Sequence, residues 1–261
     1  MQYDSFLRFV SLTSFASLKT LPSLPPDHSR LFLCRHGETN NNKLRLLQGS
    51  GVDVPLNPAG RAQAAQLAQS LSALPIDLVV SSPLGRAKST ADFIAAAQKP
   101  GIERSVRHEL SEQSFGSLEG MPMSECKLQL DAVNAAWQAG RTDAKAATDG
   151  ESLDDVWNRA RGALWDDGLL GSRVPGRQVA VVAHSTFNKL VLSQALGRGL
   201  ARVGEVRQAL CCINVLDVAV DDGKVTVVAT NIRPESADVP QLTAVLSACR
   251  VLLLSGQRGL R

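Results

Sequence analysis

The sequence of 261 residues predicts an α/β fold, a three-layer α/β/α sandwich with a mostly parallel central sheet. Three short apolar runs support this prediction, and they span residues 31–34, 76–80 and 179–183. Each run is followed by a polar turn and then by a segment whose apolar residues have helical spacing. Because strands that alternate with helices are usually parallel and buried on both faces, we expect helices on both sides of one sheet.

Four helices are predicted over residues 61–73, 86–97, 153–164 and 186–196. Apolar side chains recur in them three and four residues apart, as they do on one face of a helix. Asn57 and Pro58 precede the first helix as a start signal, and Gly197 follows the last one in the position of a C-cap. These helices are expected to cover the predicted strands.

The remainder of the chain predicts a hairpin and two terminal segments. Residues 215–220 and 225–229 are apolar runs around a polar turn, which indicates a β-hairpin. Residues 242–253 place their apolar side chains on one face of a helix that is expected to pack on the domain. The predicted divisions are a flexible leader of residues 1–29, a main domain of residues 30–232 and a C-terminal tail of residues 233–261 that carries the amphipathic helix.

The composition excludes several classes of protein. Hydrophobic residues make up 44% and charged residues 20%, which is typical of a globular chain and not of a disordered one. No apolar run approaches the roughly 20 residues that a membrane-spanning helix needs. The 28 basic residues barely exceed the 25 acidic ones and aromatic residues make up only 4%, so nucleic acid is not an expected partner.

The five cysteines favour a reducing, intracellular compartment, because their number is odd and no Cys-x-x-Cys pair occurs. The cytoplasm is the expected location. The serine-rich leader leaves an organelle, a plastid or a mitochondrion, as the alternative, with residues 1–29 as a transit remnant.

Charged and nucleophilic residues follow the predicted strands where each one ends. Arg35 and His36 come directly after the first strand, Arg86 lies just beyond the second, and His184 and Ser185 come after the third. Ligands of open parallel sheets bind at this edge, where helix N-termini present free N–H groups to anions. Two guanidinium groups suit the oxygens of a phosphoryl group, and a neutral imidazole can attack its phosphorus.

A carboxylic acid is needed to protonate the leaving oxygen, and Glu112 in the loop-like stretch 109–116 is the candidate. His36, His184 and Glu112 could instead imitate the two-histidine, one-carboxylate set of a metal site. Adjacent arginines would repel the cation. No metal and no other cofactor is therefore expected.

Several motifs occur in one consistent order along the chain. They are residues 35–39 (Arg-His-Gly-Glu-Thr) with Asn42 and residues 48–49, residues 81–87 (Ser-Ser-Pro-Leu-Gly-Arg-Ala), residues 110–112 with 115–120, residues 150–152 (Gly-Glu-Ser) and residues 182–184 (Val-Ala-His). Together these stretches resemble the signature of the histidine phosphatase superfamily, which includes the cofactor-dependent phosphoglycerate mutases. The resemblance covers about residues 30–232.

This resemblance implies a phosphoglycerate mutase-like fold and a role for each matching residue. The implied catalytic residues are His36 as the phosphorylated nucleophile, Glu112 as the proton donor and His184; the implied substrate-binding residues are Arg35, Asn42 and Arg86, and Ser185 is a further substrate-binding candidate. Ser185 stands where the family usually has glycine, so its hydroxymethyl group would either crowd the phosphate or donate a hydrogen bond to it.

The expected reaction is hydrolysis of a small phosphorylated metabolite by a metal-independent phosphomonoesterase through a phosphohistidine. Mutase members carry an arginine-rich patch and a tyrosine beside the acid, whereas the single tyrosine here is Tyr3 and no paired arginines follow Gly120 before Arg141. The alternatives are a cofactor-dependent phosphoglycerate mutase and a phosphate-binding scaffold with negligible turnover. A homodimer is left open.

Overall fold

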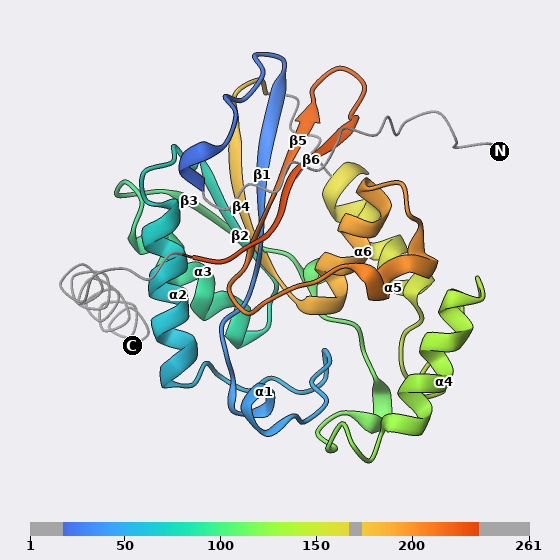
Figure 1. Ribbon diagram of the computed structural model, residues 1–261. Helices are drawn as coiled ribbons and strands as arrows, with labels where there is room; N and C mark the ends of the chain where they lie inside the picture. Colours follow the sequence, from blue (N-terminus) through green and yellow to red (C-terminus); the bar gives the residue numbers. More distant parts are fainter. Residues whose placement is uncertain (1–17, 167–173, 235–261) are drawn as a thin grey trace.

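The computed structural model describes residues 18–166 and 174–234, which form one mixed sheet between two layers of helices (Figure 1). The strands are β1 (His28–Arg35), β2 (Leu78–Ser81), β3 (Glu103–Val106), β4 (Gln178–Ala183), β5 (Ile213–Ala219) and β6 (Val225–Ile232). Their order is β3-β2-β4-β1-β5-β6. The first four strands are parallel to one another, whereas β5 and β6 form an antiparallel hairpin beside β1. The predicted sandwich with its mostly parallel sheet is confirmed.

Both faces of the sheet are buried because successive side chains of a strand point to opposite faces. On β1, Leu31 and Leu33 belong to one apolar cluster and Phe32 and Cys34 to another. The helices α2 (Pro58–Leu71) and α3 (Gly85–Ala96) cover the face of the second cluster, and α4 (Lys127–Gln138), α5 (Leu153–Arg161) and α6 (Ser185–Ala195) lie on the other side (Figure 1). These clusters form the two halves of the core.

Local capping explains where the helices begin. The side chain of Asn57 accepts from the N–H of Gly60 ahead of α2, and Pro58 occupies the first turn. Ser152 and Asp155 form a capping box at the start of α5. The predicted third helix is shorter than expected as an α-helix, because residues 162–166 continue it as a π-helix. The predicted helix over residues 242–253 lies outside the described residues.

Short elements connect these layers. They are α1 (Asn40–Leu44) and the 3-10 helices Leu18–Thr20, His108–Leu110, Gly116–Leu118 and Leu200–Glu205. Leu18 and Leu21, which the sequence places in the leader, pack partly buried against the cluster under α2 and α3. None of the helices in the described ranges is long and apolar enough to cross a membrane.

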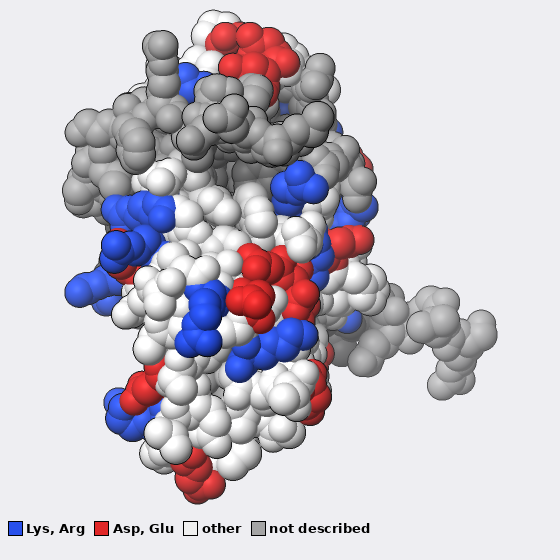
Figure 2. Space-filling model, turned by 90° about the vertical axis from the view of Figure 1, so that its right-hand side faces the viewer, with Lys and Arg blue, Asp and Glu red and all other residues white. Residues whose placement is uncertain are grey.

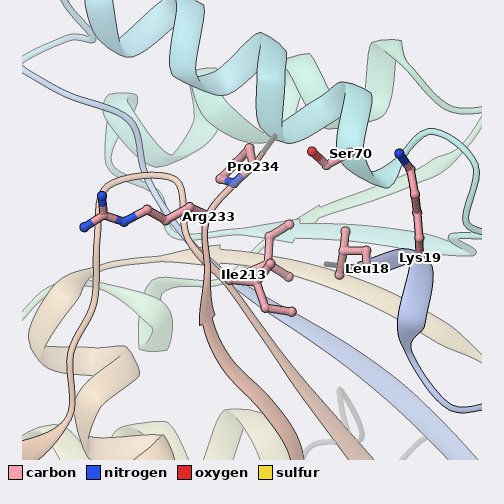
Figure 3. A pocket seen from close by; sticks show the side chains of 7 residues that line it. Leu18, Lys19, Ser70, Ile213, Arg233 and Pro234 are labelled. Atoms are coloured by element: carbon pink, nitrogen blue, oxygen red, sulfur yellow. The ribbon is translucent and has the colours of Figure 1, made fainter. Parts of the chain in front are cut away.

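A small hollow lies between α2 and the β5–β6 hairpin (Figure 3). It is lined by Leu18, Lys19, Ser70, Ile213, Ile232, Arg233 and Pro234. None of these is a predicted site residue, so the hollow is separate from the chemistry described next.

Candidate active site

The carboxyl ends of two neighbouring parallel strands bring the predicted histidines together. β1 and β4 are paired so that Arg35 lies opposite Ala183, and His36 and His184 follow directly. The centroids of the two rings are 5.2 Å apart and their planes are inclined by 56°. Both side chains are buried, with 3% of His36 and none of His184 exposed. The structure therefore places both histidines at one edge of the sheet, as the strand pattern predicts.

The hydrogen bond of His36 decides which ring nitrogen carries a proton. Its Nδ1 lies 2.7 Å from the carbonyl oxygen of Gly37, and since a carbonyl only accepts, Nδ1 is the protonated nitrogen. In the neutral ring, Nε2 then keeps its lone pair. Gly37 must lack a side chain, because a Cβ there would lie 2.5 Å from the carbonyl oxygen of Gly60.

The surroundings hold both histidines in the neutral form. Burial, followed by the charges of Arg35 and Arg86, keeps the pKa of His36 well below its usual range, while the bond to Gly37 partly opposes them. Burial is also the first cause of the low pKa of His184, followed by His36 and the two arginines. Neutral imidazoles beside two guanidinium groups can contact an anion without giving up the lone pair of His36 Nε2.

The lowered pKa values predict that acid destabilises the fold. Below the unfolded value of about 6.5, the unfolded chain binds a proton at each histidine and the folded chain does not, so stability is full above pH 6.5 and falls as the pH is lowered. We expect roughly 1 kcal/mol per pH unit for each of His36 and His184. Urea denaturation between pH 7.5 and 5 would measure this slope. A His184→Phe variant with an unchanged slope would contradict the assignment.

His184 is hydrogen-bonded through one of its ring nitrogens. Nε2 lies 2.8 Å from the hydroxyl of Ser82, which directly follows β2. This hydroxyl also accepts from the N–H of Leu84 at 3.3 Å. Nδ1 is buried and has no hydrogen-bond partner in the described part of the chain. It is therefore available to a ligand.

Arg86, in the first turn of α3, is fully buried and is held by the loop that precedes α2. NH1 and NH2 donate to the carbonyl oxygens of Val52 and Gly49, both at 2.9 Å. The amide of Gln48, oriented from its hydrogen-bond partners, accepts from Nε at 2.7 Å. Asp53 lies 3.6 Å from NH1 and also accepts the first N–H of α3. The guanidinium is thus fixed in place before any ligand binds.

Arg35 has one anchored and one unpartnered nitrogen. NH1 donates to the carbonyl oxygen of Gln208 at 2.7 Å. The Gln208 side chain is in turn fixed by two hydrogen bonds with the buried Asn214, at 2.8 and 3.0 Å. Nε of Arg35 is buried without a hydrogen-bond partner among the residues described. A phosphoryl oxygen would satisfy this donor.

Glu112 is the carboxylate of the predicted segment 109–116 that binds the start of the helix after His184. It is 4% exposed and lies at the N-terminus of α6, directly after His184. Oε2 accepts from the N–H of Thr186 at 3.2 Å, and Oε1 accepts from the N–H groups of Phe187 at 3.2 Å and Gln113 at 3.0 Å. These three donors fix the orientation of the carboxyl group.

Asn42 and Ser185 lie in the first turns of α1 and α6, respectively. Asn42 is the third residue of α1, and its Oδ1 accepts from the N–H of Thr39 at 3.1 Å as part of a capping box. The Thr39 hydroxyl bonds the amide of Gln48, so Asn42 is linked to Arg86 through two intermediates. Ser185 opens α6 and is half-buried. Within residues 18–166 and 174–234, neither side chain is hydrogen-bonded to His36.

The structure adds residues to the site that the sequence analysis did not predict. Ser82 and Gln48 stand inside the quoted motifs and could have been singled out there. Gln208 contributes a backbone carbonyl, which leaves no sequence signal. Lys189 lies near Arg35 and Glu112, since burial and Arg35 lower its pKa while Glu112 raises it, but a lone lysine in a helix is uninformative. No cluster in the described ranges has three or more side chains that could hold a metal ion.

Comparison with known proteins places this chain in a family. The model of the histidine phosphatase superfamily (branch 1) matches residues 31–233. Phosphoglycerate mutase-like protein 4 of Arabidopsis thaliana is 37% identical over 160 residues, which cover 60% of this chain and 67% of that protein. The 2-carboxy-D-arabinitol-1-phosphatase of Triticum aestivum is 29% identical over 222 residues, which cover 84% of this chain but only 43% of that enzyme. The chain thus spans less than half the length of the wheat relative.

A solved structure agrees with the sequence match. A mutant phosphoserine phosphatase of Entamoeba histolytica in complex with phosphoserine has a TM-score of 0.66 and 25% identity, and the match covers 78% of this chain and 96% of that one. The family match extends from the first residues of β1's apolar run to the end of β6, so it includes every element that carries a site residue. The chain belongs to the histidine phosphatase superfamily.

Proposed function

We propose that the protein is a metal-independent phosphomonoesterase that hydrolyses a small phosphorylated metabolite through a phosphohistidine at His36. One observation carries the proposal: the bond from Nδ1 to Gly37 leaves Nε2 of a neutral, buried imidazole with its lone pair. An unprotonated ring nitrogen near the charges of Arg35 and Arg86 can act as a nucleophile toward a phosphoryl group that those arginines bind.

The reaction would proceed in two displacements at phosphorus. In the first, Nε2 of His36 attacks, a phosphorus–nitrogen bond forms and the bond from phosphorus to the leaving oxygen breaks. Glu112 gives its proton to that oxygen. In the second, water attacks the phosphohistidine, Glu112 takes up a proton, and inorganic phosphate is released with His36 restored.

Charge on the phosphoryl oxygens would be stabilised by the donors that the structure leaves available. Nε of Arg35 and Nδ1 of His184 lack hydrogen-bond partners in the described ranges, and Arg86 contributes a second guanidinium. Asn42 and Ser185 are proposed as further ligands, through the amide NH₂ and the hydroxyl or first helical N–H, respectively. Preorganised donors of this kind need no rearrangement when charge develops.

The proposed substrate class is supported by what the names of two relatives say of those proteins. The wheat relative is named as a 2-carboxy-D-arabinitol-1-phosphatase, and the Entamoeba structure contains phosphoserine. We therefore propose phosphorylated sugars and phosphorylated small acids as the first substrates to test. On the face that carries α4 and α5, basic and acidic side chains are interspersed (Figure 2), a pattern that does not favour nucleic acid.

The test measures hydrolysis and the intermediate together. Purified protein in EDTA is given para-nitrophenyl phosphate and the proposed substrates, and the reaction is stopped in alkali, in which phosphohistidine survives. We expect phosphate release and a labelled histidine. Isomerisation of phosphoglycerate faster than hydrolysis, with a bisphosphoglycerate primer, would establish the mutase alternative. Phosphate binding without release would establish the scaffold alternative.

An intracellular location is proposed from the state of the thiols. Cys34, Cys126, Cys211 and Cys212 are all free and buried, which fits a reducing compartment. Cytoplasm or organelle and a homodimer stay predictions, which fractionation and size-exclusion chromatography would test.

A further inference from the structure

Arg159 of α5 binds the loop that carries Glu112 by its backbone. NH1 donates to the carbonyl oxygens of Glu109 and Ser111, both at 2.7 Å, and NH2 donates to that of Glu112 at 3.0 Å. The remaining donors pair with Glu151, from Nε to Oε1 at 2.9 Å and from NH2 to Oε2 at 3.0 Å. All five N–H groups of the guanidinium are therefore engaged.

Glu151 holds the same loop from its other end. Oε2 accepts from the N–H of Ser114 at 2.8 Å, and the N–H of Glu151 donates to the carbonyl oxygen of Ser114 at 2.8 Å. The carbonyl oxygen of Glu151 accepts from the side chain of Gln113 at 2.8 Å. Glu151 and Arg159 thus bracket Glu112, since one binds the residues after it and the other binds it and the residues before it.

Arg159 is held in place because the helix that carries it, α5, is part of the core. Leu153, Val156 and Ala160 of α5 are fully buried, and the loop itself has only the 3-10 turn His108–Leu110 before Glu112. The backbone of Glu112 therefore takes its position from α5, while its carboxyl oxygens take theirs from the N-terminus of α6.

We propose that Arg159 and Glu151 are positioning residues that hold the carboxyl group of Glu112 where it delivers a proton to the leaving oxygen. The inference rests on the proposed phosphatase function. Arginine is required at position 159, because a planar fork can reach three carbonyl oxygens and a carboxylate at once, whereas an ammonium group cannot. An ordinary exposed ion pair would have no such preference.

Two substrates with different leaving groups distinguish a loss of proton delivery by Glu112 from a general loss of activity. Para-nitrophenolate leaves as a stable anion, whereas the phenolate of phenyl phosphate needs a proton more strongly. For Arg159→Lys we expect a loss of kcat/KM on the order of 10²-fold with phenyl phosphate and little change with para-nitrophenyl phosphate. Glu112→Gln should give the same pattern more strongly, and adding Arg159→Lys to it should cost nothing further. Arg161→Ala, an exposed arginine of the same helix, is the matched control and should leave both rates unchanged.

The possible results distinguish the two proposals. If the wild type hydrolyses neither substrate, the proposed function fails. If the wild type is active but Arg159→Lys slows both substrates equally, or the losses of Arg159→Lys and Glu112→Gln add, the positioning role is overturned. Glu151→Gln is measured in parallel, with melting temperatures, because it removes the charge and preserves the shape. A selective loss in both folded variants supports the inference.

Discussion

Replacement of His36 by alanine is expected to lower kcat by at least ~10⁴-fold with every phosphomonoester that the wild type hydrolyses, because it removes the proposed nucleophile of the first displacement. The arginines and His184 would still bind phosphate, since none of their anchoring bonds is made by the side chain of His36. A variant that binds phosphate and does not turn over is therefore the expected result.

The measurement combines steady-state rates with trapping of the phosphoenzyme and calorimetric titration of inorganic phosphate. His28→Ala is the control, because His28 lies at the start of β1, the opposite end of the strand from His36. A phosphohistidine that persists in the His36→Ala variant, or activity within tenfold of the wild type, would contradict the nucleophilic role. Loss of folding would show as a lost thermal transition and is read separately from the rate.

The strand ends are the part of the site that sequence reveals well. β1, β2 and β4 each contain a continuous apolar run, and the residues that follow these strands must converge because parallel neighbours end at the same edge. This rule brings His36, His184 and the neighbourhood of Arg86 together without knowledge of any loop. The start signal at Asn57 is the N-cap of α2, although the helix begins at Pro58, three residues before the predicted start at residue 61.

The parts that sequence does not reveal depend on backbone contacts or weak patterns. Arg159 donates to main-chain carbonyl oxygens, and Gln208 and Gly49 supply such oxygens to the two arginines of the site. Because every residue has a main-chain carbonyl, these contacts leave no signal in the sequence. β3 is a short edge strand whose side chains are mostly exposed, so it lacks an apolar run. α4 buries only Val133, Ala136 and Trp137, a face too narrow to stand out.

Asp217→Ala is expected to destabilise the protein by about 3–5 kcal/mol, a large part of the ~5–15 kcal/mol typical of a folded domain. Asp217 of β5 lies opposite Arg30 of β1 and accepts from its Nε at 2.6 Å and its NH2 at 2.8 Å. Only 6% and 7% of the two side chains are exposed. Removal of the carboxylate leaves a buried guanidinium whose remaining hydrogen bond within the described residues is from NH1 to the carbonyl oxygen of Pro22.

Urea denaturation followed by circular dichroism measures this loss in the free energy of unfolding. Two further variants test whether the loss arises from burial of the unpaired charge. The double variant Arg30→Met with Asp217→Leu should recover most of the stability, because the cost lies in the unpaired charge more than in the lost pair. Asp131→Ala, which breaks the exposed Lys127–Asp131 pair of α4, should change stability by less than about 1 kcal/mol. Equal effects of the buried and the exposed deletion would refute the argument from burial. Asp217→Ala should keep its activity at low denaturant concentration. Arg30 lies six residues before His36, which is roughly 20 Å along an extended strand. Arg35 and Arg86 are also held by hydrogen bonds that do not involve Arg30 or Asp217.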